Sequence, residues 1–142
     1  MKNITLCAIN SKYIHSCPAV YYLEAGLKAA MPEMQISIIE ASVNDTAEHI
    51  LYSVFESAPE IVGFSVYIWN VAMVAKLCKS IRAVNPDIRI ILGGPEVSYG
   101  IAHTDIKESD YDLIISGEGE RAFPEAVKII AEGKQVKEKT VS

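Results

Sequence analysis

Two adjacent glycines, Gly93 and Gly94, follow the mostly apolar run Ile88–Leu92 and precede Pro95. A run of this kind is typical of a buried parallel strand, and a proline ends the hydrogen-bonding ladder of such a strand. Because glycine has no Cβ atom, another molecule can approach the backbone closely at this point. Open α/β sheets bind ligands at the carboxyl ends of their strands. A single glycine would serve an ordinary turn, so the pair favours a ligand contact over a turn alone.

Aromatic side chains follow a second apolar run, where Tyr67 and Trp69 come after Ile61–Val66. Aromatic rings offer a flat and largely apolar platform of the kind that lines ligand pockets. The alternative is that Trp69 covers the edge of the core. His15 is the third candidate, because imidazole is a common ligand of transition metals, although a histidine in a loop is more often only solvated.

The sequence argues against several other chemistries. The end of the first apolar run, Cys7 to Asn10, supplies no acidic cluster for a phosphoacceptor, and no Gly-x4-Gly-Lys-Ser/Thr loop is present. Gly117 to Ala122 fits the Gly-x-Gly-x-x-Gly/Ala dinucleotide pattern. That segment follows the last apolar run, and its acids would repel a pyrophosphate. A tight turn with acids near a helix N-terminus is the favoured reading, and nucleotide binding stays as an alternative.

The elements that would position these residues alternate between strands and helices. Strands are expected at residues 3–10, 35–40, 61–67, 88–92 and 113–116. Helices are expected to begin at Pro18, at the capping-box pair Asp45 and Glu48, after Asn70 as a cap, and at Pro124. This alternation predicts an α/β fold: a doubly wound, five-stranded parallel sheet of flavodoxin-like order 2-1-3-4-5 in three α/β/α layers.

In this strand order the ligand-facing loops are residues 10–18, 65–70, 93–99 and 117–121, around the switch point between the first and third strands. The candidate ligand-binding residues are therefore Ser11, His15, Ser65, Tyr67, Trp69, Asn70, Gly93, Gly94, Pro95, Glu96, Gly117 and Gly119. No residue in these loops is predicted to be catalytic.

Composition sets the broad class. The chain has 142 residues, of which 50% are hydrophobic and 22% charged, which is typical of a globular domain. The net charge of −5 without a basic stripe argues against a nucleic-acid partner. No apolar run reaches the ~20 residues that a membrane span needs, and the N-terminus lacks signal-peptide features, so we expect a cytoplasmic protein without a membrane partner.

The three cysteines, Cys7, Cys17 and Cys78, are widely spaced, which fits a reducing compartment and excludes a Cys-x-x-Cys site. Cys7 and Cys78 are expected in the core. Residues 1–133 are expected to form one domain. The polar stretch 134–142 is expected to be a linker toward a missing C-terminal domain.

Three segments in combination resemble the cobalamin-binding domain found at the N-terminus of B12-dependent radical SAM proteins. They are Gly63–Asn70, Gly93–Ser98 and Gly117–Glu120, and the resemblance extends over nearly the whole chain. The wider B12-binding fold carries Asp-x-His-x-x-Gly after strand one, Ser-x-Leu after strand three and Gly-Gly after strand four. Ser65 matches the second signature at its serine, with Tyr67 in place of the leucine, and Gly93-Gly94 matches the third.

The first signature is degraded, because the segment Tyr13–Pro18 keeps only His15. A histidine that binds a metal is normally oriented by a carboxylate, and Tyr13 replaces the aspartate that would supply one. The resemblance therefore leaves two readings of the lower face of the cobalt. Either His15 is the cobalt ligand, or cobalamin binds with no histidine on the metal and its lower face rests against Tyr67 or Trp69; we lean to the second.

The resemblance implies cobalamin as the cofactor and a parent enzyme of methyltransferase type that also uses S-adenosylmethionine and a 4Fe-4S cluster. The partner would be a C-terminal radical SAM domain of the same chain. The cluster would need a Cys-x3-Cys-x2-Cys motif that these cysteines do not form, so this piece alone should not be catalytic. The alternatives are a degenerate domain of the same fold that docks another domain without a cofactor, and a nucleotide-binding Rossmann-like domain.

Overall fold

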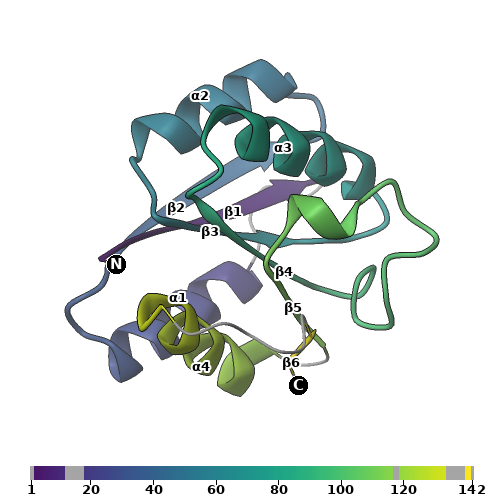
Figure 1. Ribbon diagram of the computed structural model, residues 1–142. Coiled ribbons are helices and arrows are strands. Elements are labelled where there is room, and N and C mark those ends of the chain that lie inside the picture. Colours follow the sequence, from purple (N-terminus) through teal and green to yellow (C-terminus); the bar gives the residue numbers. More distant parts are fainter. Residues whose placement is uncertain (1, 12–17, 117–118, 134–139, 142) are drawn as a thin grey trace.

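The computed structural model describes residues 2–11, 18–116, 119–133 and 140–141. It is a three-layer α/β/α structure around one parallel sheet of order β2-β1-β3-β4-β5-β6 (Figure 1). The strands are β1 (Asn3–Asn10), β2 (Gln35–Ser42), β3 (Ile61–Ser65), β4 (Arg89–Gly93), β5 (Leu113–Ile115) and β6 (Thr140–Val141). The helices are α1 (Pro18–Ala30), α2 (Ala47–Glu56), α3 (Val71–Val84) and α4 (Gly119–Ala131), with a 3-10 turn at Glu108–Asp110.

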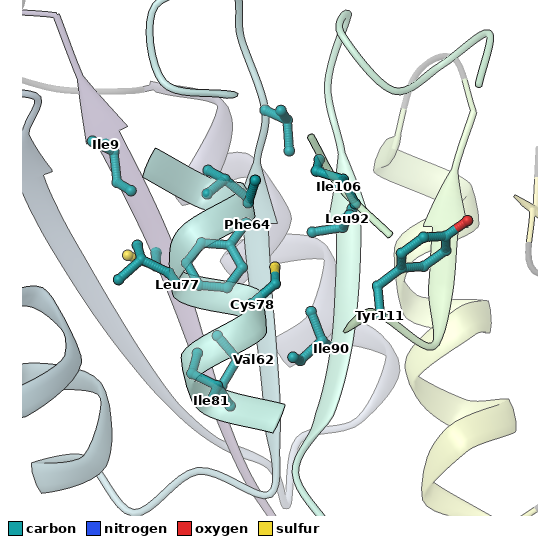
Figure 2. Close-up of a cluster of buried hydrophobic side chains, with 14 of the residues drawn as sticks. Ile9, Val62, Phe64, Leu77, Cys78, Ile81, Ile90, Leu92, Ile106 and Tyr111 are labelled. Carbon is teal, nitrogen blue, oxygen red and sulfur yellow. The ribbon is translucent and has the colours of Figure 1, made fainter. Parts of the chain in front are cut away.

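Helices α2 and α3 cover one face of the sheet, and α1 and α4 cover the other (Figure 1). Alternate side chains of strands β1 to β5 contribute to one of two cores, because successive residues of a strand point to opposite faces. Figure 2 shows part of the α3-side core, in which Val62 and Phe64 of β3 lie near Leu77 and Ile81 of α3. On the opposite face, Leu6, Leu27 and Phe123 belong to the second core. Burial of both faces explains why these strands read as continuous apolar runs.

The predicted order 2-1-3-4-5 is confirmed, and the structure adds a sixth strand at its edge. Thr140 pairs with Ile114 and Val141 with Ile115, both in parallel. These two residues lie in the stretch that was expected to be a linker. Backbone pairing at an open sheet edge does not need an apolar pattern, so no pattern in the sequence indicates this strand.

Two helix starts differ from the prediction. The N-cap of α2 is Thr46, whose hydroxyl accepts from the His49 N–H at 3.1 Å, whereas Asp45 accepts from the Ser42 N–H at 2.8 Å. Helix α4 begins at Gly119 and contains Pro124 in its interior. Burial of Ala122 and Phe123 against the core accounts for the earlier start. No helix among the described residues is long and apolar enough to span a membrane.

The first and third strands separate before they end. Strand β1 pairs with β2 along its whole length, through Asn10 opposite Ser42, but pairs with β3 only as far as Cys7 opposite Phe64. The two strands therefore part at the carboxyl edge, at the switch point where the strand order reverses.

Candidate functional site

A cavity of about 310 Å³ lies at this carboxyl edge, on the face of the sheet that α1 and α4 cover. Its wall is mainly apolar, and Ser65 and Tyr67 are the lining residues whose side chains carry a hydroxyl group, together with Tyr22. The lining residues are Leu6, Ala19, Val20, Tyr22, Leu23, Gly63, Phe64, Ser65, Tyr67, Ile91, Gly93, Gly94, Ile115 and Phe123. The cavity thus lies between the sheet and two helices, and not in a gap between β1 and β3 alone, because those strands are hydrogen-bonded as far as Cys7 and Phe64.

The two adjacent glycines have different roles. A Cβ atom on Gly93 would find only the Ile115 Cβ, 4.0 Å away, so the missing side chain at Gly93 leaves space in the cavity. Gly94 has a φ of +103°, and a Cβ there would meet the carbonyl oxygen of Val66 at 2.5 Å. The fold itself therefore requires glycine at position 94, whereas glycine at position 93 keeps the cavity open.

Gly63 is a third glycine of the cavity wall, and it was not among the predicted site residues. A Cβ at this position would lie 3.1 Å from Leu6 Cδ2 and 3.7 Å from Phe123 Cε1. Because Gly63 has no Cβ atom, Phe123 of α4 can approach the sheet closely. A glycine inside a strand is a recognised sign of close approach, so the sequence did carry a signal for Gly63.

Tyr67 and Trp69 form a stacked pair beside the cavity. Their ring centroids are 4.5 Å apart and their planes differ by 4°. Tyr67 lines the cavity, while Trp69 is 41% exposed and its Nε1–H donates to the carbonyl oxygen of Ile9 at 3.2 Å. The pair is therefore an aromatic wall attached to the end of β1, and Trp69 does not simply cover the core.

Asn70 is buried beneath this wall, with 1% of its surface exposed. It occupies the N-cap position of α3, as predicted, but its side chain makes no capping bond. Its Oδ1 instead accepts from the Tyr67 N–H at 2.8 Å, and its Nδ2 donates to Ile9 O at 2.9 Å and Ser65 O at 3.0 Å. The side-chain amide therefore binds the backbone of the loop and of the two strands, and Asn70 does not line the cavity.

The loop after β4 is held in place by its own hydrogen bonds. Ser98 donates to Gly94 O at 2.9 Å, and Ser116 donates to Ser98 O at 2.7 Å. Glu96 lies 3.3 Å from His103, measured between Oε2 and Nε2. Pro95 is exposed, and neither it nor Glu96 lines the cavity.

The structure brings four predicted site residues together at the cavity: Ser65, Tyr67, Gly93 and Gly94. Trp69 and Asn70 do not line the cavity, but Trp69 stacks on Tyr67 and Asn70 accepts a hydrogen bond from the Tyr67 N–H. Ser11 is partly buried just after β1 and does not line the cavity, and Gly119 is the first residue of α4. His15 and Gly117 lie outside the described residues.

The helical side of the wall was not predicted from the sequence. Helix α4 supplies Phe123, and α1 supplies Ala19, Val20, Tyr22 and Leu23. Apolar side chains at helical spacing look the same whether they face a core or a cavity. Of these residues, Tyr22 is 65% exposed, which places it at the mouth of the cavity.

The two described thiols take no part in the site. Cys7 and Cys78 are both buried in the core, as predicted. Burial raises the pKa of Cys7 to about 12 and also raises the pKa of Cys78, so neither is a thiolate at neutral pH. The described residues hold no group of three or more His, Cys, Asp or Glu side chains that could bind a metal ion.

Comparison with known proteins adds a family and several relatives. A family model described as "B12 binding domain" matches residues 4–127. The "Uncharacterized methyltransferase PH0819" of Pyrococcus horikoshii is 28% identical over 109 residues, which is 74% of this chain and 23% of the relative. The "Cobalamin-dependent radical SAM methyltransferase TokK" of Streptomyces tokunonensis is 31% identical over 67 residues, or 47% of this chain and 10% of the relative.

Among solved structures, that of the apo "Cobalamin-dependent S-adenosylmethionine radical enzyme OxsB" superposes with a TM-score of 0.69 at 20% identity. The match covers 98% of this chain and 20% of the OxsB chain, and at this identity it shows a shared fold. The chain therefore spans no more than 23% of the length of any of these three proteins.

Proposed function

The chain belongs to the B12-binding domain family, and we propose that it binds cobalamin at the carboxyl edge of β3 and β4. The observation that carries this proposal is the cavity whose wall includes Ser65 and the space left by Gly93. These residues match the Ser-x-Leu and Gly-Gly signatures that pointed to the family. They come from separate strands and meet at one site.

The size of the cavity fits part of this cofactor. Pockets that bury a whole drug-sized ligand usually measure ~300–1,000 Å³, and this cavity, at about 310 Å³, is at the lower limit. Cobalamin combines a broad corrin ring with a narrower nucleotide tail. The tail would enter the apolar cavity past Ser65 and Gly93, and the ring would rest outside on the edge, beside the Tyr67–Trp69 wall.

We propose that no histidine of this chain binds the cobalt, and that the lower face of the ring rests against the wall formed by Tyr67 and Trp69. The replacement of the orienting aspartate by Tyr13 supports this assignment, since a ligand histidine normally has a carboxylate partner. The exposed ring of Trp69 supports it too, because it offers a flat apolar surface at the edge of the sheet. When bound, cobalamin would supply the organometallic chemistry, while this chain positions it and shields it from water.

We further propose that this domain serves a larger cytoplasmic enzyme of the cobalamin-dependent radical SAM methyltransferase type. Residues 134–142, proposed from the sequence as a linker toward the partner domain, would then contribute β6 to the sheet of this domain on the way. The name of the TokK relative supports the class. S-adenosylmethionine and a 4Fe-4S cluster would belong to the partner domain, because the cysteines here lack the Cys-x3-Cys-x2-Cys spacing. The free thiols of Cys7 and Cys78 support a reducing compartment.

Titration of the chain with hydroxocobalamin tests the proposal directly. We expect a shift of the visible spectrum and retention of the cofactor through gel filtration. Absence of both would overturn the proposal in favour of a docking domain without a cofactor, and binding of NAD in its place would favour the nucleotide-binding alternative. The substitution His15→Ala should leave the spectrum of the complex unchanged, and a changed spectrum would show that the imidazole contacts cobalt.

A further inference from the structure

We infer that Asn70 is a positioning residue that fixes the aromatic wall of Tyr67 and Trp69 across the opening between β1 and β3. This inference deepens the proposed function, on which its ligand-binding part rests. Strands β1 and β3 part near their carboxyl ends. Their pairing ends at Cys7 and Phe64, so the carbonyl of Ile9 has no ladder partner in β3.

Beyond the last paired residues of β1 and β3, side chains supply the hydrogen bonds to the β1 backbone. Ile9 O accepts two side-chain hydrogen bonds, from Asn70 Nδ2 at 2.9 Å and from Trp69 Nε1 at 3.2 Å. The second Nδ2–H of Asn70 donates to Ser65 O at 3.0 Å, at the end of β3. One buried amide therefore connects the ends of both strands and sets the distance between them.

Asn70 also shapes the loop that carries the aromatic rings, through its backbone N–H and its side-chain oxygen. The Asn70 N–H donates to Tyr67 O at 3.1 Å, while the Tyr67 N–H donates to Asn70 Oδ1 at 2.8 Å. These two bonds close the turn from Tyr67 to Asn70. The closed turn brings the rings of Tyr67 and Trp69 into their stack, at 4.5 Å between centroids.

An asparagine at a helix N-cap ordinarily uses its side chain to cap the helix. Asn70 makes no such bond, although it stands at the start of α3. Its two side-chain N–H groups instead donate to the ends of the two strands, and its side-chain oxygen accepts from the loop. Residues that depart from their usual local role, as Asn70 departs from helix capping, are expected at functional sites.

Trp69 is the only tryptophan of the chain, so its fluorescence reports on the wall alone. We would compare the wild type with Asn70→Ala and Asn70→Asp. The aspartate keeps the acceptor for the Tyr67 N–H but places a carboxylate against two carbonyl oxygens. The matched control is Thr5→Val, which removes another buried polar contact, the 2.6 Å bond between the hydroxyls of Thr5 and Ser57.

Both Asn70 variants should red-shift the emission of Trp69 and increase its quenching by acrylamide in the absence of any ligand. Both should also raise the Kd for hydroxocobalamin about tenfold, because Asn70→Ala loses all three side-chain hydrogen bonds and Asn70→Asp loses two, so the wall is no longer held for the ligand. Thr5→Val should lower the midpoint of urea unfolding while leaving emission, quenching and Kd at wild-type values.

Asn70 variants that unfold at lower urea but keep wild-type emission and quenching would overturn the inference, since the residue would then be only structural. If Asn70→Ala does not fold, Asn70→Asp provides the same readouts, and both failing to fold while Thr5→Val folds would likewise contradict a role limited to positioning. Failure of the proposed function is distinguishable, because a wild type that does not bind hydroxocobalamin leaves the emission and quenching test intact.

Discussion

Gly94 lies against the backbone of Val66 so closely that a Cβ atom there would be 2.5 Å from the carbonyl oxygen of Val66 and 2.8 Å from its nitrogen. Val66 is held in that position, because its N–H donates to Gly93 O at 2.7 Å and its carbonyl accepts from the Glu96 N–H at 3.3 Å. The backbone of β4 and that of the segment after β3 therefore meet with no room for a side chain between them.

The substitution Gly94→Ala should therefore destabilise the protein itself. The added methyl group combines strain at a φ of +103° with the contact to Val66, and we expect the free energy of unfolding to fall by about 2–4 kcal/mol. Urea denaturation measures this loss. Gly100→Ala is the control, because its φ is +116° but no atom lies within 4 Å of the new Cβ. Equal losses of unfolding free energy in the two variants would show that the contact with Val66 does not contribute to the destabilisation.

Gly93→Val should weaken ligand binding while leaving the stability of the protein almost unchanged. The new Cβ meets only Ile115 at 4.0 Å, and valine is favourable in a strand, so we expect the free energy of unfolding to stay within about 0.5 kcal/mol of the wild-type value. The valine methyl groups would occupy the cavity and raise the Kd for hydroxocobalamin at least about tenfold. The smaller Gly93→Ala should give an intermediate Kd, and unchanged binding by both variants would mean that the ligand does not enter this cavity.

The buried thiols should be unreactive in the folded protein. Because burial raises the pKa of Cys7 to about 12, and that of Cys78 as well, their thiolate fractions at pH 8 are small and reagents cannot reach them. In a Cys17→Ser variant, Ellman's reagent should label the two remaining thiols only after urea is added. Rapid labelling of the folded variant would contradict their burial.

The same thiols give stability a pH dependence on the alkaline side. The unfolded chain loses the Cys7 proton near pH 9 and the folded chain only near pH 12, so this contribution to stability is complete below pH 9 and is lost as the pH rises toward 12. The slope should be up to about 1.4 kcal/mol per pH unit for Cys7, measured by urea denaturation between pH 9 and 10.5. Cys7→Ala should reduce the slope by the share of Cys7 and leave that of Cys78, and an unchanged slope would assign it to other groups.

Asp112→Asn should lower stability without affecting the ligand site. Asp112 stands just before β5, at the amino edge of the sheet, and accepts from Arg82 Nη2 at 2.9 Å, Arg89 Nη1 at 3.2 Å and the Ile90 N–H at 2.8 Å. Loss of the charge at this partly buried carboxylate should cost about 1–3 kcal/mol of unfolding free energy. The exposed Asp87→Asn is the control. A changed Kd for hydroxocobalamin in Asp112→Asn would show that the two edges of the sheet are coupled.

The sequence by itself determined the fold and the family. Apolar runs separated by helical spacings specify a parallel sheet covered on both faces, and the order 2-1-3-4-5 is confirmed. Ser65 and Gly93-Gly94 pointed to the B12-binding family, which is also confirmed. These features were readable because they depend on local backbone chemistry, namely strand periodicity and the absence of a Cβ atom.

Only the tertiary structure decided how the two glycines differ, because that difference depends on which backbone passes each of them. It also decided that Asn70 serves the loop and the strands in place of the helix, and that α1 and α4 complete the cavity with residues such as Tyr22 and Phe123. The pairing of β6 with β5 belongs to this group too. Each of these depends on contacts between residues far apart in the chain, and no local pattern records such contacts.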